Sequence, residues 1–146
     1  MKSYSDVFSA LRREKRAALI PFFVIGDPDF DSSLALVKAT IDAGADILEL
    51  GVPFSDPIAN GPTIQKADIR AVRSGMNLRR AMEFIRQIKN YRDIPIGLLM
   101  YYNLITHYGT EAFFRDAHDA GVNSVLVADM TIDDAGEVLG PVRDAG

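Results

Sequence analysis

The chain has 146 residues, a formal net charge of −4, 48% hydrophobic and 25% charged residues, and no cysteine. This length is enough for one domain with a hydrophobic core. The negative charge argues against binding to nucleic acid or an acidic membrane, and the absence of cysteine excludes disulfides and thiol chemistry. The first residues lack the apolar core of a signal peptide, and no apolar run could span a bilayer, so we expect a cytoplasmic protein.

The first unit of the chain is a strand followed by a helix. The apolar run 18–25 predicts a buried strand, and residues 26–29 have the composition of a turn. Asp31 or Ser32 can cap the next helix, which Gly44 ends. The inner face of this helix is formed by residues three and four positions apart, namely Leu34, Val37 and Ile41.

The second unit contains one strand and two helices. Residues 47–51 predict the strand, and Pro62 and Thr63 open a helix that continues to about Arg73. Gly75 separates this helix from another, whose inner face is lined by Leu78, Met82 and Ile85.

The third and fourth units repeat the pattern. Residues 95–100 and 124–128 predict strands, and residues 110–120 predict a helix with Phe113 and Ala117 facing inward. A last helix is indicated by an apolar stripe, which consists of Ile132, Ala135, Val138, Leu139 and Val142.

This order predicts an α/β fold with a parallel sheet covered by helices, in strand order 1-2-3-4 with right-handed crossovers. No linker divides the chain, so we expect residues 1–146 to form one domain. A closed (βα)8 TIM barrel needs about 250 residues, so the chain corresponds to the first four βα units, as a half-barrel or a truncated barrel. Because two strand edges stay open, we expect self-association of the half-barrel.

The stretch 49–65, ELGVPFSDPIANGPTIQ, carries most of the candidate chemistry. In parallel α/β proteins, active sites are built on the loops that follow the carboxyl ends of the strands. Alternation along the second strand turns Leu48 and Leu50 toward the helices and Glu49 toward the barrel mouth.

Glu49 has the expected surroundings of an acid/base catalyst. Its charged form would be poorly solvated among apolar residues of the neighbouring strands, which suits it to transfer protons. The alternative is a structural glutamate paired with Lys or Arg. The apolar residues expected around it are Phe22, Leu99 and Leu126.

Polar and aromatic residues follow each of the later strand ends. The loop 53–62 contains three prolines, which indicate a shaped loop, although a plain surface connection is the alternative. Residues 101–103, Tyr-Tyr-Asn, could sandwich a planar substrate or form a packing cluster. Asp129 could bind a ligand, orient a neighbour or cap a helix. His107 and His118 are isolated, so neither is interpreted as a metal ligand.

Four segments together resemble the tryptophan synthase alpha chain family. The resemblance implies a (βα)8 barrel fold. It also implies the activity of a lyase of tryptophan biosynthesis, which cleaves indole-3-glycerol phosphate to indole and glyceraldehyde 3-phosphate without a cofactor or metal. It also implies a heterotetramer with a beta chain, which carries pyridoxal phosphate and receives the indole. The segments are PFFVIGDP (21–28), DAGADILELGVPFSDPIANGPTIQ (42–65), IGLLMYYN (96–103) and GVNSVLVAD (121–129).

The resemblance implies roles by position. Glu49 matches the family's acid/base glutamate, which acts at the glycerol hydroxyl and at indole C3. The residues that match the surroundings of the indole are Phe22, Ile64, Leu99, Tyr101, Leu126 and Ala128. The residues that match contacts to the beta chain are Pro53, Phe54, Asp56 and Asn103.

The chain departs from the family pattern at Asn60, where the family has an aspartate as its second catalytic carboxylate. That aspartate holds the indole N–H, and an amide can accept the hydrogen bond but carries no negative charge. Losing one optimised electrostatic contact slows a reaction about 10²–10³-fold. We therefore expect slow cleavage with Asn60, and recovery in Asn60→Asp.

The resemblance also places the family's phosphate-binding loops in later barrel units, in line with the usual position after strands 7 and 8. We therefore expect this chain alone to be inactive or impaired. The alternatives are a non-catalytic half-barrel or relic that docks on the tryptophan synthase beta chain, and a different phosphate-binding barrel enzyme.

Overall fold

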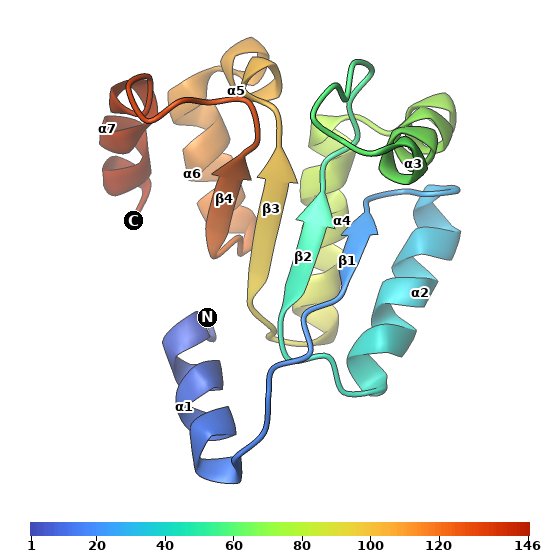
Figure 1. Cartoon of the computed structure of the whole chain (residues 1–146), viewed down its shortest axis with the longest axis vertical. Helices are drawn as coiled ribbons and strands as arrows, with labels where there is room; N and C mark the ends of the chain where they lie inside the picture. Colours follow the sequence, from blue (N-terminus) through green and yellow to red (C-terminus); the bar gives the residue numbers. More distant parts are fainter.

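Four parallel strands form the centre of the molecule, and their carboxyl ends lie at one edge of the sheet (Figure 1). The structure is a computed structural model that describes residues 1–146. All neighbouring strands are parallel, so the predicted parallel sheet and its strand order are confirmed. In spatial order, the strands are β1 (Phe22–Val24), β2 (Leu48–Gly51), β3 (Ile96–Met100) and β4 (Ser124–Val127).

Helices cover one face of this sheet and both of its ends. Three of them pack side by side on that face: α2 (Phe30–Asp42), α4 (Leu78–Tyr91) and α6 (Thr110–Ala120). The others are α3 (Pro62–Arg73) and α5 (Tyr102–Tyr108) toward the carboxyl ends of the strands, α7 (Gly136–Ala145) beside α6, and α1 (Tyr4–Glu14) at the opposite end (Figure 1). None of these helices has the length and apolar character needed to cross a membrane.

One main hydrophobic core joins the sheet to the covering helices. Leu48 and Leu50 of β2 point into it and have no exposed surface, as alternation along the strand predicts. Each fully buried side chain of this size stabilises the fold by about 1.5–3 kcal/mol. The predicted inner faces of three helices are buried in the same core: Leu34, Val37, Ile41, Leu78, Met82, Ile85, Phe113 and Ala117.

The other face of the sheet, which we call the open face, carries Glu49, Leu99 and Leu126. No helix crosses its centre in Figure 1. Helix α1 covers only its lower end, where Val7 and Leu11 pack against Ile47 in a small second core. The Tyr4 hydroxyl of α1 also lies 2.7 Å from Oγ of Ser124 on β4. The open face is therefore closed at the amino ends of the strands and accessible toward their carboxyl ends.

The first and last predicted elements were too long. The predicted strand 18–25 is reduced to β1, and Leu19 and Ile20 are 51% and 43% exposed. Pro21 lacks an N–H group and cannot donate to a sheet, which explains why the strand begins after it. The last helix begins at Gly136 and leaves Ile132 in a turn, 90% exposed, so only Val138 of the predicted stripe is buried.

Two helices and one cap were missed. Helix α1 begins with a capping box, in which Ser3 and Asp6 bond each other's backbone N–H, and this Ser-x-x-Asp signal was present in the sequence. Helix α5 has 7 residues, and its own N-cap residue Tyr101 makes no side-chain cap hydrogen bond, so no signal within the segment indicated a helix. The cap of α2 is Asp29 rather than Asp31 or Ser32, because the Asp29 carboxylate accepts the Ser32 N–H at 2.9 Å.

A charged contact fastens the segment between α1 and β1 to the start of β2. Arg16 donates two hydrogen bonds to Asp46, at 2.7 and 2.8 Å, and the backbone N–H of Leu19 donates a third at 2.8 Å. These hydrogen bonds, chiefly the one from Arg16, hold the pKa of Asp46 below its ordinary value.

We predict that Asp46→Asn lowers the free energy of unfolding at neutral pH by about 1 kcal/mol, a value discounted because half-exposed Arg16 is partly screened by water. Because folding lowers the pKa, this stabilisation is complete above the ordinary value of 3.8 and is lost as the pH falls through the folded value. Urea unfolding at neutral and acid pH measures the difference. Asp133→Asn, at an exposed carboxylate, is the control. An Asp46→Asn deficit that stays constant into strong acid would contradict this account.

We also predict that the 146-residue chain self-associates. The outer edges of β1 and β4 are unpaired, and the open face exposes Phe8, Ile20 and Leu126 at 45%, 43% and 54%. Pairing of edges or burial of these side chains between copies would remove apolar surface from water. Sedimentation velocity over a range of concentrations tests this. A stable monomer at high concentration that binds no fluorescent apolar probe would refute it.

Candidate functional site

Glu49 belongs to a row of residues that crosses the sheet. The strand register places in this row, from β1 to β4, Phe22, Glu49, Gly97 and Ser124. A second row lies two positions further along the strands, toward their carboxyl ends. In this row Gly51 is paired with Leu99, and Leu99 is paired with Leu126. The sheet therefore brings together Glu49 and three of the apolar residues that the sequence placed around it.

Two glycines shape the surface within these rows. A Cβ atom on Gly51 would lie 2.8 Å from Cζ of Phe22, so the phenyl ring rests directly against the strand. A Cβ atom on Gly97 would lie 2.9 Å from the Tyr4 hydroxyl and 3.0 Å from Oγ of Ser124, which bond each other. The absence of a side chain at Gly51 thus leaves room for the Phe22 ring, and its absence at Gly97 leaves room for the hydroxyl pair of Tyr4 and Ser124.

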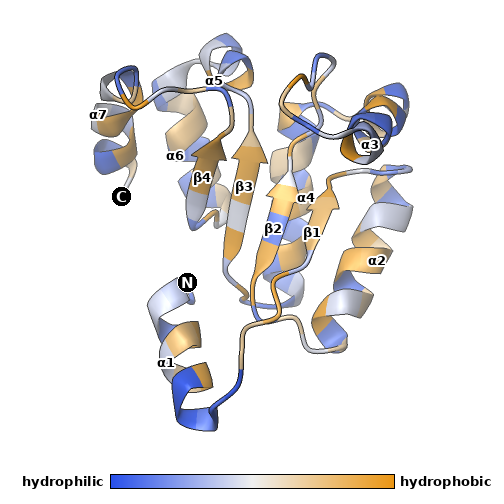
Figure 2. Cartoon of the chain, in the orientation of Figure 1, coloured by the Kyte–Doolittle hydropathy of each residue, from blue (hydrophilic) through white to orange (hydrophobic).

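Glu49 is the one charged residue of β2, visible as a blue band in an otherwise apolar strand (Figure 2). Its side chain is half-buried and lines a cavity of about 250 Å³, in which seven of ten lining residues are hydrophobic. Glu49 takes part in none of the ion pairs of the structure. The structure therefore does not contain the alternative, a structural pair of Glu49 with Lys or Arg.

Tyr101 fixes the loop that follows β2. Its hydroxyl accepts the backbone N–H of Ala59 at 2.9 Å, and its ring lies 5.0 Å from that of Phe54 between centroids. Tyr101 is 2% exposed, and both its hydroxyl and its ring contact this loop. The shaped loop that the prolines indicated is thus anchored on the end of β3.

Helix α3 holds the other end of the loop. Nε2 of Gln65 donates to the carbonyl oxygen of Asn60 at 2.9 Å, and Nδ2 of Asn60 donates to Oδ2 of Asp68 at 3.0 Å. Asp68 is 2% exposed. Burial raises the pKa of the Asp68 carboxyl, although the hydrogen bonds from Asn60 and from the Phe54 backbone act in the opposite direction.

Asp68 was missed in the sequence analysis. It lies on the buried side of α3 together with Ala67 and Ala71, and Ile64 one turn earlier packs against the main core. An acidic residue at this helical spacing among apolar residues was a readable signal, because buried carboxylates need a partner. The partner, Asn60, lies in the loop before the helix, where spacing alone does not reveal the contact.

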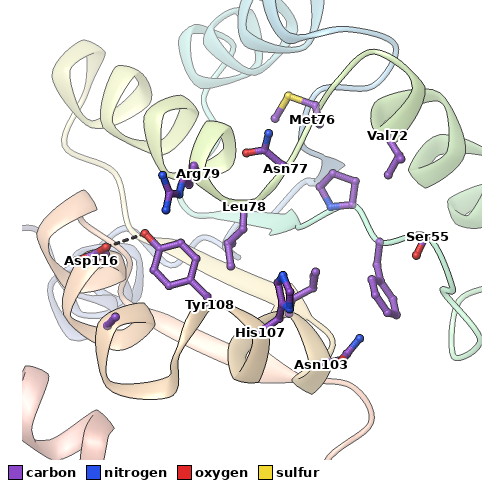
Figure 3. Close-up of a pocket in the computed structure, with 14 residues that line it drawn as sticks. Ser55, Val72, Met76, Asn77, Leu78, Arg79, Asn103, His107, Tyr108 and Asp116 are labelled. Atoms are coloured by element: carbon purple, nitrogen blue, oxygen red, sulfur yellow. Dashed lines mark hydrogen bonds between the residues drawn. The ribbon is translucent and has the colours of Figure 1, made fainter.

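A second hollow, of about 750 Å³, opens on the rim beside the loop, between α4, α5 and α6 (Figure 3). Pro53 and Phe54 line it from the loop and Asn103 lines it from α5. The Tyr108 hydroxyl donates to Asp116 at 2.7 Å on its far wall. Three of the four residues expected to contact a beta chain thus share one hollow, and the fourth, Asp56, is exposed on the loop beside it.

The remaining candidates lie at the ends of β3 and β4. Ala128 is half-buried, and its N–H donates to the carbonyl oxygen of Met100 at 2.9 Å. The Asp129 carboxylate accepts the N–H of Tyr102 at 2.7 Å, so it caps the start of α5 on the neighbouring unit. His118 is exposed on α6.

Comparison with known proteins agrees with this geometry. A family model described as tryptophan synthase alpha chain matches residues 8–146. The chain belongs to the tryptophan synthase alpha chain family. It is 46% identical over 137 residues to that protein from Methanothermobacter thermautotrophicus, covering 94% of this chain and 50% of the relative. It is 45% identical over 136 residues to the Escherichia coli protein, which covers 92% of this chain and 51% of the relative.

Solved structures of the family have the same fold. The alpha subunit from Legionella pneumophila superposes with a TM-score of 0.94 at 31% identity, over 100% of this chain and 56% of that one. A tryptophan synthase structure from M. tuberculosis superposes with a TM-score of 0.91 at 34% identity, over 99% of this chain and 58% of that one. The chain spans about half the length of the curated relatives it matches. The TIM-barrel class and the assignment to this lyase family of tryptophan biosynthesis are thereby confirmed.

We predict that Gly51→Ala lowers the free energy of unfolding by about 1–3 kcal/mol, nearer the lower figure, because the Phe22 ring can swing away from the new methyl group. Gly140→Ala is the matched control. Its Cβ would meet nothing within 4 Å in α7, so alanine should be neutral or add up to about 1 kcal/mol through helix propensity. Denaturant unfolding measures both variants, and equal stability of Gly51→Ala and the wild type would refute the prediction.

Proposed function

We propose that the full-length form of this protein cleaves indole-3-glycerol phosphate to indole and glyceraldehyde 3-phosphate, with Glu49 as its acid/base residue. The observation that carries the proposal is the Glu49 carboxylate itself. It lies on an apolar open face, outside every ion pair, on a strand of a chain that belongs to this family. Membership of the family supports the reaction, and the geometry of β2 supports the role of Glu49.

The proposed reaction needs one proton delivered and one removed. A protonated Glu49 gives its proton to C3 of the indole, which leaves positive charge on the ring nitrogen. The resulting carboxylate then takes the proton of the adjacent glycerol hydroxyl. A C=O bond forms as the bond to C3 breaks, and the electrons of that bond return to the ring. Neutral indole and the aldehyde result, and Glu49 is protonated again. One carboxyl group can therefore carry out both proton transfers.

The apolar residues of the open face would hold the indole. Phe22, Leu99 and Leu126 lie in the row of Glu49 or the next one, where a planar ring can pack against them. Leu126 is 54% exposed and so has surface to offer a ligand. Ile64 and Ala128, both half-buried, are further proposed substrate contacts, whereas Tyr101 is 2% exposed and would act on the substrate through the loop that it holds.

We propose that a tryptophan synthase beta chain docks on the rim at Pro53, Phe54, Asp56 and Asn103. The hollow of about 750 Å³ supports this, because three of these residues line it. Phe54 also packs on Tyr101, which holds the loop that ends at Asn60, so a partner there would touch the loop of the proposed active site. Pyridoxal phosphate would belong to the beta chain, and a cytoplasmic location remains part of the proposal.

A second candidate is a non-catalytic chain that only docks on the beta chain. Asn60 favours it, because the family carboxylate expected at this position is replaced by a neutral amide. The two candidates differ in whether Glu49 performs chemistry.

We predict that Glu49→Gln in the full-length form lowers kcat for indole release about 10²–10⁴-fold, because an amide cannot exchange the proton. The assay measures indole from indole-3-glycerol phosphate with the beta chain present. Glu111→Gln, at an exposed position in the first turn of α6, is the control. Undiminished release by Glu49→Gln would contradict the proposal. A wild type that binds the beta chain but releases no indole would establish the second candidate instead.

A further inference from the structure

We infer that Asp68 is a positioning residue, whose buried carboxylate orients and polarises the Asn60 amide so that Oδ1 of Asn60 can accept a hydrogen bond from the ring N–H of the substrate. The inference rests on the proposed function, because it assigns the source of negative charge in the same site. The family resemblance implies no role for position 68.

The direction of the Asn60 amide follows from the chemistry of its partner. An ionised carboxylate has no proton to donate, so the group facing Oδ2 of Asp68 at 3.0 Å must be the NH2 of Asn60. Oδ1 then points away from Asp68, and no donor of the protein bonds it. The amide thus presents an unused acceptor, which is the group that an indole N–H requires.

The pair is held rigidly on both sides. The Asn60 backbone is bonded through its carbonyl oxygen to Gln65 at 2.9 Å and through its N–H to the carbonyl of Pro57 at 3.1 Å. Asp68 lies on α3 and is 2% exposed, and the backbone of Phe54 is close enough to lower the pKa of its carboxyl. Rotation of the amide would place its oxygen against a carboxylate, which is repulsive.

A carboxylate behind an amide strengthens the acceptor at its other end. A hydrogen bond to an ionised partner is about twice as strong as one between neutral groups, and bonds in a chain polarise one another in a low-dielectric site. The Asn60–Asp68 pair therefore delivers part of the negative potential that an aspartate at position 60 would deliver directly. In this arrangement the negative charge lies on Asp68, which is separated from the indole ring by the Asn60 amide and one further hydrogen bond.

Few groups act on the Asp68 carboxyl. Asp27, from the turn after β1, is the charged group that adds to the rise of its pKa, and Asp27 is itself bonded twice to Arg70 at 2.7 Å. Asn60 and the Phe54 backbone lower the pKa, and burial, the largest effect, raises it. The carboxylate is thus formed only above a raised pKa, so an activity that needs its charge must decline on the acid side.

The test compares four full-length proteins with the beta chain present: wild type, Asp68→Asn, Asn60→Asp and the double variant. We expect Asp68→Asn to lower kcat about tenfold or more, less than the 10²–10³ of a direct contact, with a smaller change in KM. Asn60→Asp alone should gain little, because two adjacent carboxylates share one proton. This revises the recovery expected from the sequence. The double variant, which exchanges the charge and the amide, should reach or exceed the wild-type kcat.

A merely structural Asp68 would give a different result. In that case Asp68→Asn would lower the free energy of unfolding but leave the acid limb of the kcat–pH profile in place. We expect instead that the acid limb disappears in Asp68→Asn. Asp42→Asn, at a surface carboxylate bonded to Arg92 and Tyr91, is the control. If Asp68→Asn does not fold, the side-chain amide signal of Asn60 in the wild type, followed by NMR through the acid range, replaces it. A shift with the titration of Asp68 supports the pair.

The outcomes separate this inference from the proposed function. Equal kcat and equal pH profiles for wild type and Asp68→Asn, with Glu49→Gln inactive, would overturn the role of Asp68 alone. An Asn60 amide signal that does not change with pH would also overturn it. Undiminished indole release by Glu49→Gln would instead overturn the proposed function, and the assigned role of Asp68 with it.

Discussion

The alternation of side chains along β2 is the constraint on which the rest of the structure depends. Leu48 and Leu50 must enter the core that joins sheet and helices, where they lose all contact with water. Since successive side chains point to opposite faces, Glu49 is forced onto the open face. A slip of one residue would bury the carboxylate among the helices and expose two leucines, so the stability of the fold and the placement of its charge are one requirement.

The loop after β2 turns this placement into a site. Tyr101 holds its middle from β3, and α3 holds its end through Gln65 and Asp68. Tyr101 directly follows β3, and Gln65 and Asp68 lie on α3, so the loop is bonded to two different parts of the fold. The same anchors connect the rim to the open face, because Phe54 on the rim packs on the tyrosine that bonds the loop. A partner on the rim and a ligand on the open face would therefore meet one shared segment.

The sequence predicted what depends on periodicity. The helix faces of α2, α4 and α6 and the strand order follow from apolar spacing and the regular βα alternation, and both are correct. The errors at Leu19, Ile20 and Ile132 share one cause: apolar spacing reports what can be buried, not what another element covers. The capping box of α1 was a readable signal that was overlooked. The Asn60–Asp68 contact was beyond reach, because it depends on how a loop folds back on its helix.

The bond between Tyr4 and Ser124 joins residues 120 positions apart, and Asn123 holds the carbonyl oxygen of Lys2 at 3.0 Å beside it. Contacts of such sequence separation form late, because a long loop must close before they can stabilise anything. Helix α1 is synthesised before β4, so its polar contacts with Ser124 and Asn123 cannot form until that strand has been made. The apolar side of α1 can already pack on Ile47 once β2 exists, so the hydrogen bonds to β4 would complete a docking that has begun earlier in synthesis.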